Sequence, residues 1–234
     1  MKNILLKILS ALQSIILKFH FSSVCNHGFL FNSRFNGYKK KNTAISIGTH
    51  THLNHTQFEL SPDTEIVIGD HCRLYNVKFH CCCQNLKIEI GSQCLLNDVT
   101  IWAEDKDNTV LIREGTYIGG AHIAVTGRGK SVAVGSHCMF SEGIIIRTGD
   151  SHAIINLETG EKINDEKNVM IGSHVWLAQN VTVLKGTIIE ENCVVATGAI
   201  VSGHFSKCQL IGGMPAKVLK QGISWTCDRY SSQS

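Results

Sequence analysis

Aliphatic residues recur along this chain at a spacing that fits neither an α-helix nor simple strand alternation. A five-residue phrase repeats, in which an aliphatic residue is followed by Gly, two polar residues and a small residue. Its copies, including two looser ones at Ile112 and Ile189, begin at Ile47, Ile68, Ile90, Ile112, Val134, Ile171 and Ile189. Successive starts are 21, 22, 22, 22, 37 and 18 residues apart. Repetition at this period indicates a solenoid built from stacked, similar units.

A shorter period of six lies inside the longer one. From Ile171 to Val201 every sixth residue is aliphatic, whereas helices repeat at 3.6 and strands at 2. The pattern predicts one flat side and one corner every six residues, so that three sides close an 18-residue coil. The 22-residue spacing upstream adds about four residues at one corner. The 37-residue step holds either two coils or one coil and a long excursion.

The segments outside the repeat predict a simple organisation. Residues 1–24 carry apolar residues at helical spacing and predict an amphipathic helix, which either caps the open end of the solenoid or touches a membrane peripherally. Lysines interrupt it too often for a spanning helix, and Lys18 with no A-x-A site after it argues against a signal peptide. Residues 25–44 are expected to be a connection, 45–205 the β-helix with a loop at 153–168, and 206–234 a C-terminal tail.

Composition narrows the function classes. A net charge of +3, without a basic stripe interleaved with aromatics, does not favour nucleic-acid binding. Four of the ten cysteines occupy the small-residue position of the phrase, where a free thiol packs as a compact apolar group. The consecutive Cys81–Cys83 do not have zinc-site spacing, so no metal is expected. Without an export signal, the thiols predict a cytoplasmic protein, with the inner face of the membrane as the alternative.

The long step is where the sequence predicts chemistry. It contains Asp150 and His152, followed by a polar stretch before the repeat resumes at Val169. Loops held on a rigid scaffold carry function more often than the scaffold itself. His152 also precedes Trp176 by 24 residues.

These residues resemble a known family, the hexapeptide-repeat O-acetyltransferases, and within it the galactoside, xenobiotic and capsule sialic-acid branch. The resemblance rests on the His152–Trp176 spacing and on three motifs, which are residues 175–184 (VWLAQNVTVL), 196–201 (ATGAIV) and 213–217 (GMPAK). It covers roughly residues 45 to 220 and implies an all-β solenoid, a left-handed parallel β-helix of hexapeptide repeats with an N-terminal helix and a protruding active-site loop. Ordinary parallel crossovers are right-handed, so the handedness follows from the resemblance alone.

The resemblance implies transfer of an acetyl group from acetyl-CoA to a sugar hydroxyl, of a surface polysaccharide (capsule or lipopolysaccharide) or its precursor. His152 is then the general base, because imidazole accepts a proton near neutral pH. Asp150 either orients the His152 ring or caps a turn, and Trp176 forms a wall of the acetyl and acceptor pocket. His122, where sugar acetyltransferases often have Asn, is assigned to substrate binding.

The same resemblance implies the donor site and the assembly. Gln179, Thr197 and Ser202 contact CoA, and Lys217 and Lys220 face its phosphates or are simply solvated. Solenoids of this family form homotrimers with active sites between subunits. The chain departs from the pattern at Ala178, Thr197, Ala199 and Gly203, where the family has Gly, Ala, Ser and Lys, respectively.

Other functions stay open on the sequence. An N-acetyltransferase acting on an amino sugar or xenobiotic would share these motifs. A hexapeptide-repeat carbonic anhydrase needs three zinc-binding histidines, but the histidines of the repeat share one polar corner and predict an exposed row, namely His50, His71, His137 and His174. An inactive scaffold is disfavoured, because His152, Trp176 and the Pro215 tail are all present.

Overall fold

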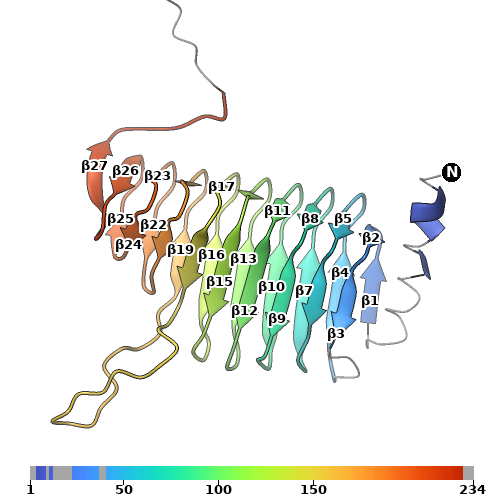
Figure 1. The fold of residues 1–234 in the computed structure, drawn as a ribbon, viewed down its shortest axis with the longest axis horizontal. Coiled ribbons are helices and arrows are strands. Elements are labelled where there is room, and N and C mark those ends of the chain that lie inside the picture. Colours follow the sequence, from blue (N-terminus) through green and yellow to red (C-terminus); the bar gives the residue numbers. More distant parts are fainter. Residues whose placement is uncertain (1–3, 9–10, 13–22, 37–40, 229–234) are drawn as a thin grey trace, which may run out of the picture.

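Three parallel sheets form the walls of a solenoid in the computed structural model, which describes residues 4–8, 11–12, 23–36 and 41–228 (Figure 1). Sheet A stacks β1 (Ser23–Asn26), β4 (Ala44–Ile47), β7 (Thr64–Ile68), β10 (Leu86–Ile90), β13 (Thr109–Ile112), β16 (Ser131–Val134), β19 (Val169–Ile171), β22 (Ile188–Ile189) and β25 (His204–Phe205). Sheet B stacks β2 (Phe29–Phe31), β5 (His52–Asn54), β8 (Arg73–Tyr75), β11 (Leu95–Asn97), β14 (Tyr117–Ile118), β17 (Met139–Phe140), β20 (Trp176–Leu177), β23 (Val194–Val195), β26 (Gln209–Gly212) and β27 (Lys217–Gln221). Sheet C stacks β3 (Arg34–Asn36), β6 (Gln57–Glu59), β9 (Lys78–Cys81), β12 (Val99–Ala103), β15 (Ala121–Val125), β18 (Ile144–Arg147), β21 (Thr182–Val183) and β24 (Ile200–Val201).

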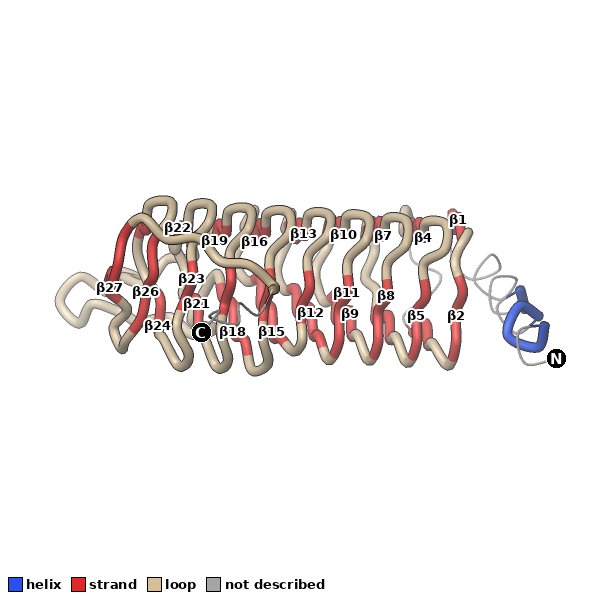
Figure 2. The backbone as a smooth tube through the Cα atoms, turned by 90° about the horizontal axis from the view of Figure 1, so that it is seen from above, coloured by secondary structure: helices blue, strands red, loops and turns tan. Residues whose placement is uncertain are grey.

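Each coil runs through sheets A, B and C in that order, and then begins again one strand further along the axis (Figure 2). We name the three turns of a coil the AB, BC and CA corners after the sheets that they join. Because every wall is a ladder of parallel strands, residues at equivalent positions of successive coils lie in rows. The predicted three-sided coil is confirmed.

The interior consists of these rows. The aliphatic residue that opens each phrase is at most 1% exposed, in Ile47, Ile68, Ile90, Ile112, Val134, Ile171 and Ile189. The small-residue row is buried as well, and its Cys72, Cys94, Cys138 and Cys193 point thiols at backbone carbonyls of the next coil. The predicted packing role of these cysteines is therefore confirmed.

The phrase also explains the AB corner. A Cβ at Gly135 would lie 2.4 Å from the backbone nitrogen of Ser173 in the next coil, so only glycine fits. Two residues later the chain adopts a positive φ, which histidine and asparagine tolerate better than most residues. The φ of His50, His71, His137 and His174 is between 55° and 57°. The first three are exposed as predicted, but His174 is half-buried because the C-terminal tail covers it.

The described strands extend the solenoid beyond the predicted bounds at both ends. β1, β2 and β3 form a coil that begins at the predicted end of the N-terminal helix and continues into the predicted connection, because Leu30 and Phe35 continue the interior rows. β26 and β27 lie inside the predicted tail, where β27 pairs with β26 antiparallel after the cis Met214–Pro215 bond.

Of the predicted helix 1–24, residues 4–8 and 11–12 are helical, whereas residues 23 and 24 belong instead to strand β1, because they pair with β4. The remaining residues of that prediction lie outside the described residues. The apolar side chains of Ile4, Leu5, Ile8 and Leu12 are all more than half exposed. They therefore do not bury against the first coil of this chain. No helix in the described ranges is long and apolar enough to cross a membrane. Peripheral membrane contact stays a prediction.

The 37-residue step is one coil with an excursion. The chain leaves sheet C after β18, extends away from the solenoid and returns to sheet A at β19 (Figure 1). Within the excursion, Ile155 and Lys162 form an isolated antiparallel bridge. A protruding loop thus replaces one CA corner, as the sequence predicts.

Candidate active site

His152 lies at the base of the protruding loop, where the chain has just left sheet C. Its side chain is exposed. The backbone around it is held by Asn164 from the returning arm, whose amide nitrogen donates to the His152 carbonyl at 2.8 Å. The Asn164 oxygen accepts the backbone N–H of Ile154 at 2.7 Å. Asn164 is itself buried, so the two arms of the loop are fixed to one another beside His152.

Asp150 anchors this loop to the next coil. Its carboxylate accepts from the Lys185 ammonium at 2.5 Å and from the Asn164 amide at 2.9 Å. Lys185, and secondarily Asn164, hold the pKa of Asp150 below its usual value. In the described structure the contacts of Asp150 go to these groups and not to the His152 ring. They fit an anchoring role better than a ring-orienting one.

Because the Asp150–Lys185 ion pair fixes the loop, we expect the order of the loop to depend on pH and on Lys185. Because the pKa of Asp150 is depressed in the folded state, the contribution of the ion pair is fully present above the ordinary carboxyl pKa of about 4. It is lost as the pH falls through the lower folded value. We expect Lys185→Met to speed cleavage by a glutamate-specific protease at Glu158 and Glu161 at neutral pH. The exposed Lys87→Met is the control, and equal cleavage rates in both variants would contradict the anchoring role.

Trp176 lies on a different wall. It points outward from β20 of sheet B, in a row that continues through Val194 and Leu210 to Lys220 of β27. Lys217, in the same strand as Lys220, is also exposed. Sheet B therefore brings Trp176 into one row with Lys220 and onto one wall with Lys217, both of which are predicted to bind CoA.

The other candidates occupy two corners and sheet C. Gln179 and Thr197 are exposed at the BC corner in successive coils, where the Gly198 N–H donates to the Gln179 carbonyl at 2.9 Å. Ser202 is exposed at the CA corner. His122 points outward from β15, between Thr100 and Ile145 of the neighbouring strands.

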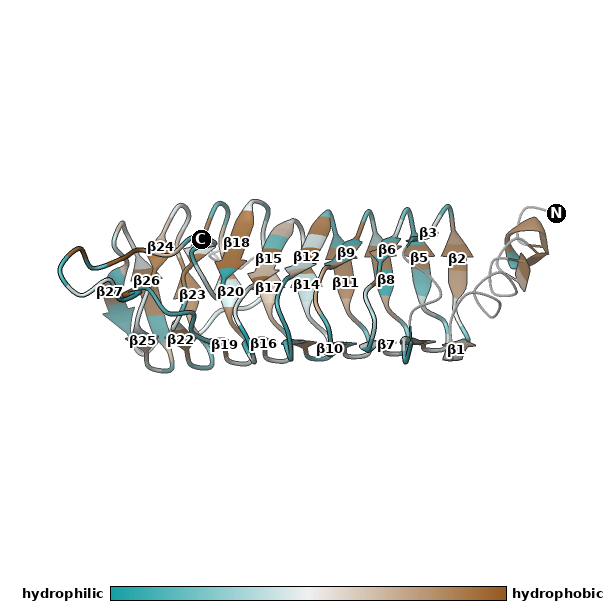
Figure 3. Cartoon of the chain, turned by 90° about the horizontal axis from the view of Figure 1, so that it is seen from below, coloured by the Kyte–Doolittle hydropathy of each residue, from teal (hydrophilic) through white to brown (hydrophobic). Residues whose placement is uncertain are grey.

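The surroundings of His122 are partly apolar. Its neighbour Ile145 is 39% exposed on β18, which is one of the brown, hydrophobic strands in Figure 3. Burial lowers the pKa of His122, and the nearby Arg147 guanidinium lowers it further. His122 is therefore held as a neutral imidazole, which can donate or accept a hydrogen bond to a sugar hydroxyl.

The predicted site residues fall into groups that lie on different sides of one chain. His152 and Ser202 share the CA corner, whereas Trp176 and Lys220 share sheet B. In a three-sided coil, sheet B is the wall opposite the CA corner. A single chain thus holds His152 and Trp176 on opposite sides of the solenoid, and they do not line one pocket.

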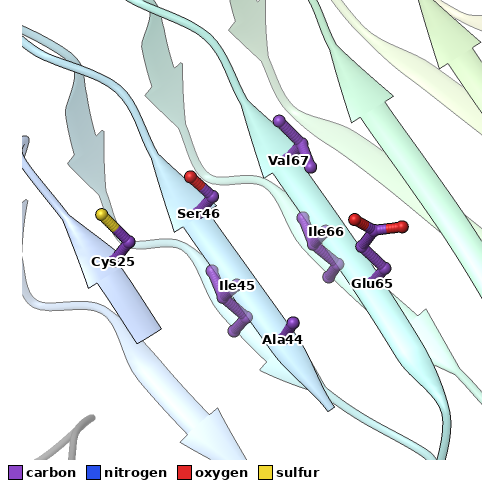
Figure 4. Close-up of a pocket in the computed structure, with 7 residues that line it drawn as sticks. All are labelled: Cys25, Ala44, Ile45, Ser46, Glu65, Ile66 and Val67. Atoms are coloured by element: carbon purple, nitrogen blue, oxygen red, sulfur yellow. The ribbon is translucent and has the colours of Figure 1, made fainter. Parts of the chain in front are cut away.

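Two cavities lie on the early coils and contain none of the candidates. One, of about 290 Å³, lies on sheet A beside Cys25, Ser46 and Glu65 (Figure 4). The other, of about 320 Å³, lies among His50, His52, His71 and Arg73. Within the described ranges, no three His, Cys, Asp or Glu side chains form a group that could hold a metal ion.

Sequence reasoning did not identify Asn164, Lys185 and Trp225 as site residues. The first two fix the loop, and their partners are 10 to 35 residues away in sequence, so spacing gave no signal. The scarcity of tryptophan, with only three in the chain, is the sequence feature that could have indicated Trp225.

No family model matches the chain. Among curated proteins, the polysialic acid O-acetyltransferase of Neisseria meningitidis is 33% identical over 193 residues, which cover 82% of this chain and 89% of that protein. Among solved structures, the polysialic acid O-acetyltransferase OatWY has a TM-score of 0.71 at 28% identity, covering 91% of this chain and 94% of its own. The polySia-specific acetyltransferase NeuO has a TM-score of 0.64 at 25% identity, covering 89% and 84%.

The fold and its similarity to solved acetyltransferases thus define a left-handed β-helix of the acyltransferase class, and the predicted fold class is confirmed. The chain belongs to the O-acetyltransferase family that contains the polysialic acid O-acetyltransferases. This membership favours O-acetyl transfer over the N-acetyltransferase and carbonic anhydrase alternatives.

Proposed function

We propose that this chain transfers an acetyl group from acetyl-CoA to a hydroxyl of a surface polysaccharide that contains sialic acid. The similarity to polysialic acid O-acetyltransferases over most of both chains carries the choice of acceptor. The position of His152, exposed on a loop whose base is fixed by Asn164, supports its role as the reacting base.

The chemistry asked of His152 is proton transfer. A sugar hydroxyl is a weak nucleophile near neutral pH, and a base must take its proton as its oxygen attacks the acetyl carbonyl carbon. His152 takes that proton and returns it to the sulfur of CoA as the C–S bond breaks, so protons and charge balance. Imidazole suits both steps because its pKa lies near the working pH.

The donor fits the later coils. Gln179 and Thr197 offer exposed polar side chains in adjacent coils at the BC corner. Lys217 and Lys220 supply two exposed cations on β27, which suit the phosphates of CoA. Acetyl-CoA would then extend along the BC side of sheet B, with its thioester toward Trp176.

We also propose that the active enzyme is a homotrimer. Because His152 and Trp176 lie on opposite sides of one solenoid, a site that uses both needs the CA corner of one chain against sheet B of another. Such a head-to-tail contact closes into a ring when the rotation is threefold. Each ring then holds three equivalent sites.

A mixed-variant experiment tests this arrangement. His152→Ala and Trp176→Ala should each be nearly inactive alone, but co-expressed chains should regain activity, because every mixed ring has one junction with both residues intact. With equal, random mixing about three quarters of the rings are mixed, so the mixture should show about one quarter of wild-type activity. Activity that stays at the level of the single variants would show that both residues act within one chain.

The acceptor is tested by incubating the protein and acetyl-CoA with polysialic acid, monomeric sialic acid, a neutral polysaccharide and an amino sugar. We expect thiol release with polysialic acid, and a product that gains one acetyl group per modified residue and loses it in mild base, as an ester does. Transfer only to the amino sugar, or a base-stable product, would overturn the proposal.

A further inference from the structure

The C-terminal tail lies on the same side of the molecule as Trp176. After β27 it runs back along the AB corner (Figure 2), and the Ile223 N–H donates to the Cys208 carbonyl at 3.0 Å. Two coils further back, the Trp225 indole N–H donates to the His174 carbonyl at 2.8 Å. The tail is thus held at two AB corners, and its position does not depend on a single contact.

Trp225 is held flat on a fixed surface. Its ring stacks on the His174 ring with centroids 4.3 Å apart and planes inclined by 7°. The His174 ring is fixed in turn, since its Nδ1 lies 2.8 Å from the side-chain oxygen of Asn192. A stacked, hydrogen-bonded tryptophan offers rigid apolar area at little conformational cost.

Trp225 also adjoins Trp176. The two indole centroids are 6.0 Å apart and the ring planes are inclined by 49°, so the two rings are adjacent and tilted toward one another. The Trp176 indole nitrogen is buried and has no hydrogen-bond partner among the described residues. Because this nitrogen is not open to solvent, Trp176 presents the rest of its half-buried indole ring, rather than its N–H, beside Trp225.

The order of residues along sheet B decides which ligand lies there. His174, under Trp225, is at the AB corner; Trp176 follows in β20; Gln179 is beyond it at the BC corner. Trp225 therefore lies on the side of Trp176 away from Gln179, which is assigned to CoA. That side is left for the acceptor.

We infer that Trp225 and Trp176 together form the sugar-binding wall of the acceptor site, so that the tail contributes a specificity-determining residue. This inference rests on the proposed function, in which Trp176 lines the site. The ligand is a sugar ring whose C–H face packs on the two indole rings.

The test is steady-state kinetics with acetyl-CoA and polysialic acid for Trp225→Ala, Trp225→Phe and Trp176→Ala. Trp225→Ala should raise the acceptor KM about tenfold or more and change the acetyl-CoA KM less than about twofold. Trp225→Phe keeps an aromatic ring without the N–H and should lie between Trp225→Ala and wild type. The matched control is Trp102→Ala, because Trp102 likewise stacks on a histidine, His80, at 3.9 Å but on sheet C.

The outcomes separate the two proposals. If Trp176→Ala raises the KM of either substrate or lowers kcat while Trp225→Ala has wild-type kinetics, the role of Trp225 is overturned and the proposed site stands. If Trp225→Ala raises both KM values equally and lowers the melting temperature, Trp225 is structural and the inference again fails. If Trp176→Ala has wild-type kinetics, the proposed site itself is wrong.

Discussion

Replacing His152 with alanine is expected to lower kcat by roughly 10²–10⁴-fold, the range over which a positioned general base accelerates proton transfer. Acetyl-CoA should still bind, because the residues assigned to it lie on sheet B, on β27 and at corners that do not depend on the His152 side chain. Thiol release gives kcat, and isothermal titration with acetyl-CoA gives the binding constant. The loss should therefore appear in turnover and not in donor affinity.

Two variants make this expectation specific. His137→Asn changes an exposed histidine at the AB corner of the same coil to a residue that tolerates its positive φ of 55°, and should keep wild-type turnover. His122→Asn changes a histidine that faces the acceptor in our assignment, and should raise the acceptor KM more than it lowers kcat. Wild-type kcat in His152→Ala would refute the general-base assignment outright.

The stacked coils could be predicted because the residues that shape each coil lie close together in sequence. An aliphatic residue every six positions, a glycine at each close approach and a small residue at each corner are all visible in the chain. The break in the repeat also located the loop of His152, since the 37-residue step is the one long interval between copies of the phrase. The early coil of β1 to β3 was not predicted, because its phrase lacks the aliphatic-Gly start of the later copies.

The contacts that complete the site could not be read in this way, because they join residues far apart in sequence. The Asp150–Lys185 pair spans 35 residues and the Trp225–His174 bond spans 51. His174 shows the limit directly: its phrase is the same as that of His137, yet the tail covers one and leaves the other exposed. The position in the repeat sets the backbone conformation of His137 and His174, whereas the C-terminal tail sets how exposed each side chain is.

Replacing Phe58 with alanine is expected to lower the free energy of unfolding by about 3–5 kcal/mol, the usual cost of removing a buried phenylalanine ring. Phe58 is fully buried and stacks between Phe35 and Phe79, with ring centroids 4.6 and 4.8 Å away. Its loss leaves a gap in the middle of the aromatic row. Urea unfolding followed by circular dichroism measures the change, with the half-exposed Tyr75→Ala as the control.

The loss of structure in Phe58→Ala should be limited to the early coils of the solenoid. Each coil contacts only its neighbours, so the early coils can lose order while the later ones stay folded. We expect faster amide hydrogen exchange in β4 to β9 of Phe58→Ala, with the strands from β18 onward protected as in the wild type. Acetyl-CoA affinity should then be unchanged at low temperature, because the donor residues lie on the later coils. Loss of protection along the whole chain would show instead that the solenoid unfolds as one cooperative unit.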